Sequence, residues 1–200
     1  CLPPYVFAEV NEIKARARAN GDDIIDFGMG NPDSPTPPHI VDKLVETVYN
    51  PRTHRYSASK GISGLRKAIS AYYLRRFNVE IDSDTETIVT LGSKEGLANL
   101  ASAITSPGDV ILVPNPSYPI HQFGFIIAGA SVRNLPVNPD GNYMKELEKA
   151  VIHSIPKPTA LVLNYPNNPT ALTADLDFYG QVVDFCRHHG IYILSDLAYA

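Results

Sequence analysis

Four short polar segments follow apolar, strand-like runs of the sequence, and their residue types suit the binding of one ligand. The first is Gly92-Ser93-Lys94-Glu95-Gly96, which opens an apolar helix. Backbone N–H groups at the start of that helix and the Ser93 hydroxyl suit a phosphate, although Ser93 serving only as an N-cap explains the same residues. The spacing matches neither a Walker P-loop nor Gly-x-Gly-x-x-Gly, so a dinucleotide site has little support.

Two turns bounded by prolines present one aromatic ring and one amide. Tyr118 stands in Pro114-Asn115-Pro116-Ser117-Tyr118-Pro119 and could stack on a planar ligand ring or simply pack at a turn. Asn168 stands in Tyr165-Pro166-Asn167-Asn168-Pro169-Thr170, where the prolines restrict the backbone. The Asn168 amide can donate and accept, so it suits a ligand with a phenolate-like oxygen and a carboxylate. An ordinary Asn-Pro turn is the alternative.

The fourth segment, Ser195-Asp196-Leu197-Ala198-Tyr199, places a carboxylate at the end of an apolar run. A carboxylate there costs free energy unless a cationic or donating group pairs with it. The N–H groups of a helix start would supply such donors, and so would the N–H⁺ of a ligand. A phosphate site, a ring face, an amide and a buried anion together fit a phosphorylated aromatic ring with a basic nitrogen, namely pyridoxal 5'-phosphate.

Alternating helical and apolar segments predict the elements that must position these side chains. We expect helices over 7–19, 38–48, 61–77, 94–104, 119–128, 143–153 and 175–189, and strands over 24–27, 87–91, 110–113, 131–135, 160–164 and 191–195. The strands from residue 87 onward are apolar at both parities, as in sheets covered on both faces. This alternation predicts an α/β fold with a mainly parallel, doubly wound sheet, whose ligands bind beyond the carboxyl ends of the strands. Residues 1–40 instead suggest an arm that crosses a surface or a partner subunit.

The composition argues against several other classes of protein. The sum of Lys and Arg is 17 and the sum of Asp and Glu is 21, so the net charge of −4 disfavours a basic nucleic-acid-binding face. The two cysteines, Cys1 and Cys186, exclude a disulfide scaffold and a Cys-rich zinc site. Neither an apolar run of about 18 residues nor a signal-peptide pattern occurs. We therefore expect a globular cytoplasmic protein that uses no metal, nucleic acid or membrane.

In this order, the four segments resemble the class I and II aminotransferases of pyridoxal phosphate fold type I, and the likeness covers essentially all 200 residues. The opening Leu2-Pro3-Pro4-Tyr5-Val6-Phe7, the segment Asn31-Pro32-Asp33 and the closing Asp196-Leu197-Ala198-Tyr199-Ala200 are most similar to the bacterial glutamate–pyruvate (alanine) aminotransferase branch. The LL-diaminopimelate aminotransferases are near relatives of that branch. The resemblance implies that residues 1–40 form an N-terminal arm, part of a small domain and a dimer contact. Residues 41–200 then form the N-terminal part of the cofactor-binding large domain.

The resemblance also implies which residues bind the cofactor. Ser93 and Lys94 would hold its phosphate, largely through backbone N–H groups. Tyr118 would stack on the pyridine ring. Asp196 would pair with the protonated ring nitrogen, and Tyr199 would bind the ring oxygen.

Further roles implied by the resemblance involve the substrate and a second subunit. Asn168 would bind the ring oxygen and help to place the substrate carboxylate, which Gly30 would allow to approach the backbone. Tyr56 would reach the cofactor phosphate of the other subunit, and Tyr5 would line that subunit's substrate site. The implied assembly is therefore a homodimer.

The sequence departs from the family pattern in two places. Ala171 follows Thr170 where much of the family has glycine, and we expect the turn to survive this change. The lysine that forms the Schiff base, and the arginine that binds the substrate carboxylate, are expected beyond Ala200, and Lys94 is not their substitute. The last strands of the sheet are also expected there, between the first strand and the others, so the 200-residue piece should expose sheet edges. The histidines outside any expected cluster are interpreted as surface or structural residues, namely His54, His121, His188 and His189.

The implied function is amino transfer between an amino acid, alanine or a similar one, and a 2-oxo acid such as 2-oxoglutarate or pyruvate. An LL-diaminopimelate or aspartate aminotransferase, a pyridoxal-phosphate-dependent β-lyase or decarboxylating relative, and a non-catalytic regulatory domain remain as alternatives. A dehydrogenase is disfavoured because the glycine fingerprint of dinucleotide binding is absent.

Overall fold

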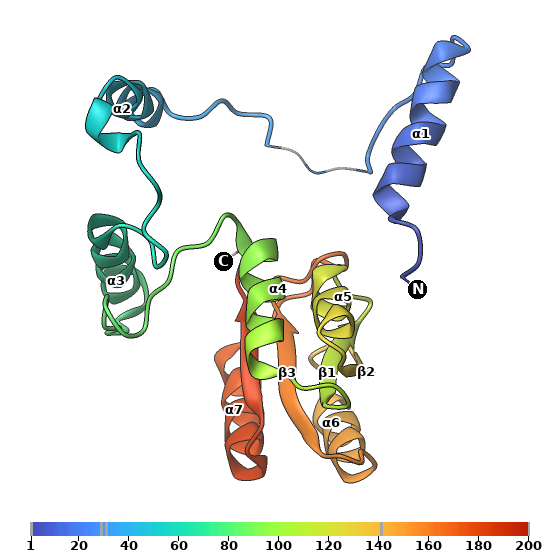
Figure 1. The fold of residues 1–200 in the computed structure, drawn as a ribbon. Coiled ribbons are helices and arrows are strands. Elements are labelled where there is room, and N and C mark those ends of the chain that lie inside the picture. Colours follow the sequence, from blue (N-terminus) through green and yellow to red (C-terminus); the bar gives the residue numbers. More distant parts are fainter. Residues whose placement is uncertain (1, 29, 31, 141, 200) are drawn as a thin grey trace. The chain divides into compact units, whose positions relative to one another are not determined.

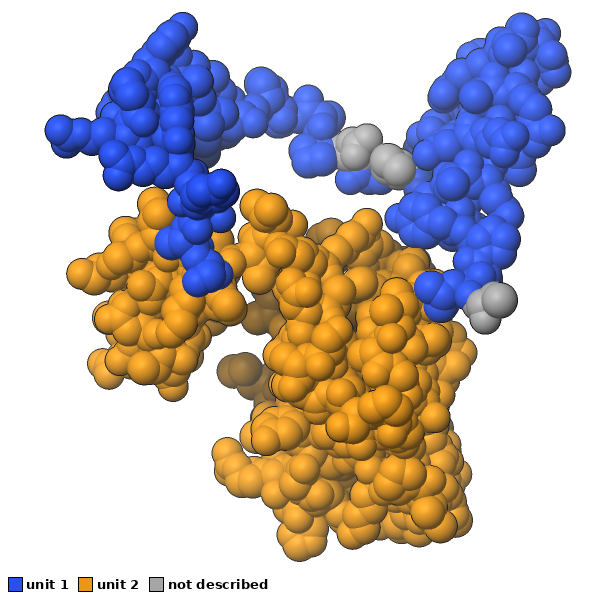
Figure 2. Space-filling view, viewed as in Figure 1, with its two compact units in different colours: residues 1–59 blue, residues 60–200 orange. Residues whose placement is uncertain are grey.

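The computed structural model describes residues 2–28, 30, 32–140 and 142–199. The chain divides into two compact units, residues 1–59 and residues 60–200, which Figure 2 shows in two colours. The larger unit carries the sheet and most of the expected site residues, so its architecture decides how that site is built.

The smaller unit consists of helices and irregular chain. Helix α1 spans Val6–Ala19, α2 spans Pro38–Val48, and a short 3-10 helix, η1, spans Pro51–Thr53. Helix α1 ends at Asn20-Gly21, as expected, where Gly21 takes a positive φ. Helix α2 begins with a proline at its first position, where the missing N–H costs no hydrogen bond.

The strand expected over 24–27 is not formed, and that prediction was wrong. Phe27 is 95% exposed, so this segment has no core to pack against. Asp26 instead accepts hydrogen bonds from Lys14 Nζ at 2.8 Å and from the Gly28 N–H at 2.9 Å. Local hydrogen bonds of this kind compete with strand pairing. They form here because, among the described residues, no strand lies beside this segment to pair with it.

The larger unit is built on a parallel four-stranded sheet. Its strands are β1 (Val110–Asn115), β2 (Ser131–Pro136), β3 (Pro158–Asn164) and β4 (Tyr192–Asp196), arranged in the order β2-β1-β3-β4 (Figure 1). Every neighbouring pair is parallel, and helices connect successive strands. The expected α/β, doubly wound architecture is therefore confirmed.

Helices cover both faces of this sheet. The unit contains α3 (Ser63–Phe77), α4 (Ser93–Ile104), α5 (Ile120–Ile127), α6 (Tyr143–Ile152) and α7 (Leu176–His189). Strand residues of one parity, such as Ile111 and Val162, form a core cluster with residues of α4 and α5. Residues of the other parity, such as Leu112 and Leu161, form a second cluster with α6 and α7. The apolar residues at both parities reflect these two buried faces.

The strand expected over 87–91 is also absent, although the segment is apolar. The Val89 N–H donates to the Lys60 carbonyl at 3.1 Å. The Val89 side chain also packs closely on Gly61, where an added Cβ would lie 2.4 Å from Val89 Cγ2. Leu91 is 92% exposed. The four strands pair only with one another, and a strand requires a partner for its backbone groups. Apolar composition alone therefore did not make this segment a strand.

Among the residues that the structure describes, none of the helices has the length and hydropathy that crossing a bilayer requires.

We expect that Leu161→Ala lowers the free energy of unfolding by about 2–5 kcal/mol, because Leu161 is fully buried in the centre of β3. Leu176→Ala, at a residue that is 87% exposed at the start of α7, is the matched control. It should change the free energy of unfolding by less than about 0.5 kcal/mol. Urea unfolding followed by circular dichroism measures both, and equal effects would contradict this assignment of the core.

Candidate functional site

Ser93, one of the two expected phosphate-binding residues, and Asp196, the expected ring-nitrogen partner, line one cavity. Its lining does not include Lys94, Tyr118, Asn168 or Tyr199. This cavity has a volume of about 560 Å³, and its wall includes Ser93 at the start of α4 and Ser195, Asp196 and Ala198 at the end of β4. Segments that are distant in sequence thus open into a single space. A ligand with an anionic group at one end and a basic group at the other could contact both.

At the phosphate end, α4 begins without a capping side chain. Its N-cap is Gly92, with φ +87°, so Ser93 is the first helical residue and is not the N-cap. The Glu95 carboxylate accepts a hydrogen bond from the backbone N–H of Leu91, just before the helix. Amides in the first turn of a helix point outward and favour an anion. The interpretation of Ser93 as a simple N-cap is therefore wrong.

Tyr118 follows β1 and lies beside Lys94, whose ammonium is 5.3 Å from the centre of its ring. At that distance a cation is attracted to the face of the ring. The turn before Tyr118 is fixed from α5, because Gln122 Nε2 donates to Ser117 Oγ at 2.9 Å. The structure thus brings Lys94 and Tyr118 together, and their roles toward a cofactor remain predictions.

Asn168 and Tyr199 also meet. The Asn168 Nδ2 donates to the Tyr199 hydroxyl at 2.9 Å, across the turns that follow β3 and β4. The expected Asn168 turn forms, and Asn167 Oδ1 closes it by accepting from both the N–H and the hydroxyl of Thr170. Ala171 occupies the position where glycine was expected and takes a φ of +59°.

Asp196 is paired with a buried histidine. Its Oδ2 lies 2.8 Å from His121 Nε2, and the His121 side chain is fully buried in α5. The His121 hydrogen bond holds the pKa of the Asp196 carboxyl below its ordinary value, although partial burial acts in the opposite direction.

The tautomer of His121 follows from its surroundings. A carboxylate can only accept, so the His121 Nε2–H donates the hydrogen bond and Asp196 Oδ2 accepts it. His121 Nδ1 is buried with no hydrogen-bond partner among the described residues.

The sequence analysis missed the contact of His121, which it interpreted as a surface or structural residue without a cluster around it. The structure corrects this, because His121 is completely buried and contacts Asp196, 75 residues further along the chain. The signal was the position of His121 in the first turn of the helix after β1. That signal becomes informative only once the tertiary structure brings the end of β4 to His121.

Three expected contributors, Tyr5, Gly30 and Tyr56, belong to the smaller unit. All three are exposed there, and Tyr56 is fully so. Their roles in the site of a neighbouring subunit remain predictions.

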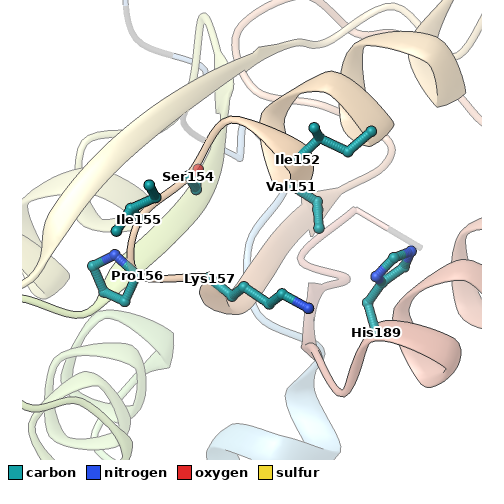
Figure 3. Close-up of a pocket in the computed structure, with 7 residues that line it drawn as sticks. All are labelled: Val151, Ile152, Ser154, Ile155, Pro156, Lys157 and His189. Atoms are coloured by element: carbon teal, nitrogen blue, oxygen red, sulfur yellow. The ribbon is translucent and has the colours of Figure 1, made fainter.

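A second hollow of about 340 Å³ lies at the opposite end of β3, and Figure 3 shows its lining by Val151, Ile152, Ser154, Ile155, Pro156, Lys157 and His189. None of the expected site residues lines it. His189 is the last residue of α7, where a basic side chain complements the negative end of the helix. The structure thus explains His189 without a ligand. No group of three or more His, Cys, Asp or Glu side chains in the described part of the chain could hold a metal ion.

Comparison with known proteins identifies relatives of the chain. Residues 22–200 match the family described as "Aminotransferase class I and II". The chain is 63% identical to AatC of Rhizobium meliloti and 52% identical to the glutamate-pyruvate aminotransferase AlaC of Escherichia coli. Both matches cover 100% of this chain but only 49% and 48% of the relatives. The chain thus spans about half the length of the curated relatives it matches.

A solved structure shares the fold. A single mutant of the aspartate aminotransferase of Thermus thermophilus superposes with a TM-score of 0.89 at 28% identity. The match covers 98% of this chain and 51% of that one.

The lowered pKa of Asp196 predicts a dependence of stability on pH. A lowered pKa in the folded state means that Asp196 stabilises the fold above the ordinary value of 3.8, and that this contribution is lost as the pH falls through the lowered pKa. In urea unfolding of the cofactor-free protein, we expect the wild type to exceed Asp196→Asn in stability at pH 7. The two should converge as the pH falls below 3.8.

The control for this prediction is the same pair of proteins with His121→Phe. Without the imidazole the burial penalty on the carboxylate remains and the hydrogen bond is lost, so Asp196→Asn should then cost less stability at pH 7. The pairing would be refuted if the difference in free energy of unfolding between wild type and Asp196→Asn changed neither with pH nor with the removal of His121.

Proposed function

Because this chain belongs to the class I and II aminotransferases, we propose that its protein transfers an amino group between an amino acid, alanine or a similar one, and a 2-oxo acid such as pyruvate or 2-oxoglutarate. Class I and II aminotransferases use pyridoxal 5'-phosphate, and we propose it as the cofactor here. The observation that carries the proposal is the single cavity lined by both Ser93 and Asp196. The 52% identity to a glutamate-pyruvate aminotransferase favours alanine as the amino donor over aspartate or LL-diaminopimelate.

The residues of the candidate site suit this cofactor chemically. The uncapped start of α4 offers N–H groups to a phosphate, so Ser93 and Lys94 would bind it. The ionised Asp196 offers a carboxylate to a protonated ring nitrogen. Tyr118, at the end of β1, would cover the face of the ring. When bound, pyridoxal phosphate supplies an aromatic ring that accepts the electrons released when the amino acid loses its α-proton.

Asp196 would keep the ring nitrogen protonated. A nearby carboxylate favours the cationic form of a base, and each unit of pKa is worth about 1.4 kcal/mol. His121 supports this role, because its hydrogen bond holds Asp196 in the ionised form. The buried histidine also shields one carboxylate oxygen from water.

Asn168 and Tyr199 would bind the ring oxygen, and their mutual hydrogen bond holds both side chains ready for it. Asn168 would also help to place the substrate carboxylate, and the proposed role of Gly30 is to let a substrate carboxylate approach the backbone. We propose that Tyr56 and Tyr5 complete the site of a second subunit, in a cytoplasmic homodimer. The exposure of both tyrosines leaves them available for that role. The proposal assigns the lysine that binds the cofactor covalently, and the carboxylate-binding arginine, to residues after Ala200.

A panel of amino donors tests the proposed reaction. We expect the full-length protein with pyridoxal phosphate to convert alanine and 2-oxoglutarate to pyruvate and glutamate faster than it uses aspartate or LL-diaminopimelate. Chromatography of the products measures each reaction. Release of ammonia, pyruvate and a thiol from an added S-substituted cysteine, without formation of glutamate, would instead indicate a β-lyase. No turnover with any of these compounds would favour a non-catalytic domain.

Replacing Asp196 tests the role of the carboxylate. Asp196→Ala should lower kcat by about a hundredfold or more, because a loss of two pKa units at the ring nitrogen corresponds to about 2.7 kcal/mol. Asp184→Ala removes an exposed carboxylate on α7 and is the matched control, expected to leave kcat unchanged. Steady-state kinetics with thermal unfolding separates lost turnover from lost stability. A kcat for Asp196→Ala within threefold of the control would exclude the role.

A further inference from the structure

Asn164, the last residue of β3, holds two segments of the candidate site with one buried side chain. Its Oδ1 accepts from the backbone N–H of Asn168 at 2.9 Å. Its Nδ2 donates to the backbone carbonyl of Asp196 at 3.0 Å. The side chain is 2% exposed, so both bonds are made away from water. One amide thus connects the turn after β3 with the end of β4.

The register of the sheet places Asn164 at the point where this connection is needed. Asn164 and Asp196 are the last paired residues of β3 and β4, and the backbone ladder ends with them. Beyond this point no further ladder hydrogen bonds fix the distance between the segments that follow β3 and β4. The Asn164 side chain continues the hydrogen bonding across the gap.

The residue type is also unusual for its position. The four preceding residues of β3, 160–163, are all buried and apolar, so a fifth apolar residue would fit the pattern. A buried polar side chain costs free energy unless its groups are bonded. An amide combines a donor and an acceptor that can serve two backbone groups at once. The two observed hydrogen bonds satisfy both polar groups of the Asn164 amide and serve one backbone group in each segment.

We propose that Asn164 is a positioning residue that sets Asn168 and Asp196 at a fixed separation. This inference rests on the proposed function, in which Asn168 binds the ring oxygen and Asp196 binds the ring nitrogen. These groups contact two different atoms of one rigid ring, so their spacing must match the ring before it binds. The other side-chain bond between the segments, from Asn168 to Tyr199, joins two side chains that must themselves contact the ligand. The buried bridge of Asn164 keeps the spacing without contacting the ligand.

Two variants separate the two ends of the bridge. Asn164→Leu has a similar volume and loses both hydrogen bonds. Asn164→Asp keeps an oxygen that accepts from the Asn168 N–H but places its second oxygen against the Asp196 carbonyl oxygen, where two acceptors repel. Val182→Ala, in the buried core of α7, is a control that lowers stability without touching the site.

The first measurement is hydrogen exchange of residues 167–172 in the cofactor-free, full-length protein. We expect exchange at the Asn168 amide to rise about tenfold or more in Asn164→Leu, since the loss of a buried hydrogen bond corresponds to at least such a factor. It should stay near the wild-type rate in Asn164→Asp and in Val182→Ala.

The second measurement is the affinity for pyridoxal phosphate and the pH at which the visible absorption of the bound cofactor changes. Both Asn164 variants should bind the cofactor about tenfold more weakly and shift this pH, because Asp196 is no longer held against the ring nitrogen. Val182→Ala should change neither. A merely structural role for Asn164 would lower stability without moving the absorption.

The inference is overturned if Asn164→Leu matches Val182→Ala within twofold in both exchange and affinity. It is also overturned if Asn164→Asp retains the affinity and absorption of the wild type. The exchange experiment needs no cofactor and no turnover, so it tests the bridge separately from the proposed function. Absence of amino transfer by the wild type would refute the function while leaving the measured bridge intact.

Discussion

A carboxylate at the end of a buried strand must be paired, and the candidate site is organised around this requirement. Asp196 ends β4 and its side chain is 12% exposed, so burial acts to raise its pKa. The imidazole of His121 reverses this by donating to one carboxylate oxygen from α5. The pair lies at the wall of the cavity that Ser93 also lines. The protein thus holds a stable anion at one end of a space whose other end favours an anionic ligand group.

The parallel sheet supplies the geometry that this pair alone could not. Carboxyl ends of parallel strands lie at one edge of the sheet, so the turns after β1, β3 and β4 converge there. Side chains then fix the spacing of the turns. Gln122 holds the turn before Tyr118, and Asn164 joins the Asn168 turn to the end of β4. The turn before Tyr118, the Asn168 turn and Asp196 are therefore each held by a side chain from another part of the fold.

The sequence predicted the segments better than it predicted their partners. Apolar residues at both parities correctly indicated the central strands β1 and β3 and their two covering layers. The outer strands β2 and β4 also formed where they were expected, although most of their residues are only partly buried or exposed. The same signal failed at 24–27 and 87–91, because apolar composition makes a strand only where another strand can pair with it. His121 was missed for a related reason, since its partner lies 75 residues away along the chain and becomes its neighbour only in the folded structure.

The amino-acid sequence by itself determined the order of the elements, the rigid proline-bounded turns and the residue types at the strand ends. These are local properties, because backbone restriction and periodic burial act over a few residues. Only the tertiary structure decided that His121 bonds Asp196, that Asn164 bridges two turns and that Ser93 and Asp196 share a cavity. Those contacts join residues from separate strands and helices, and their distances depend on the order and register in which the strands pair.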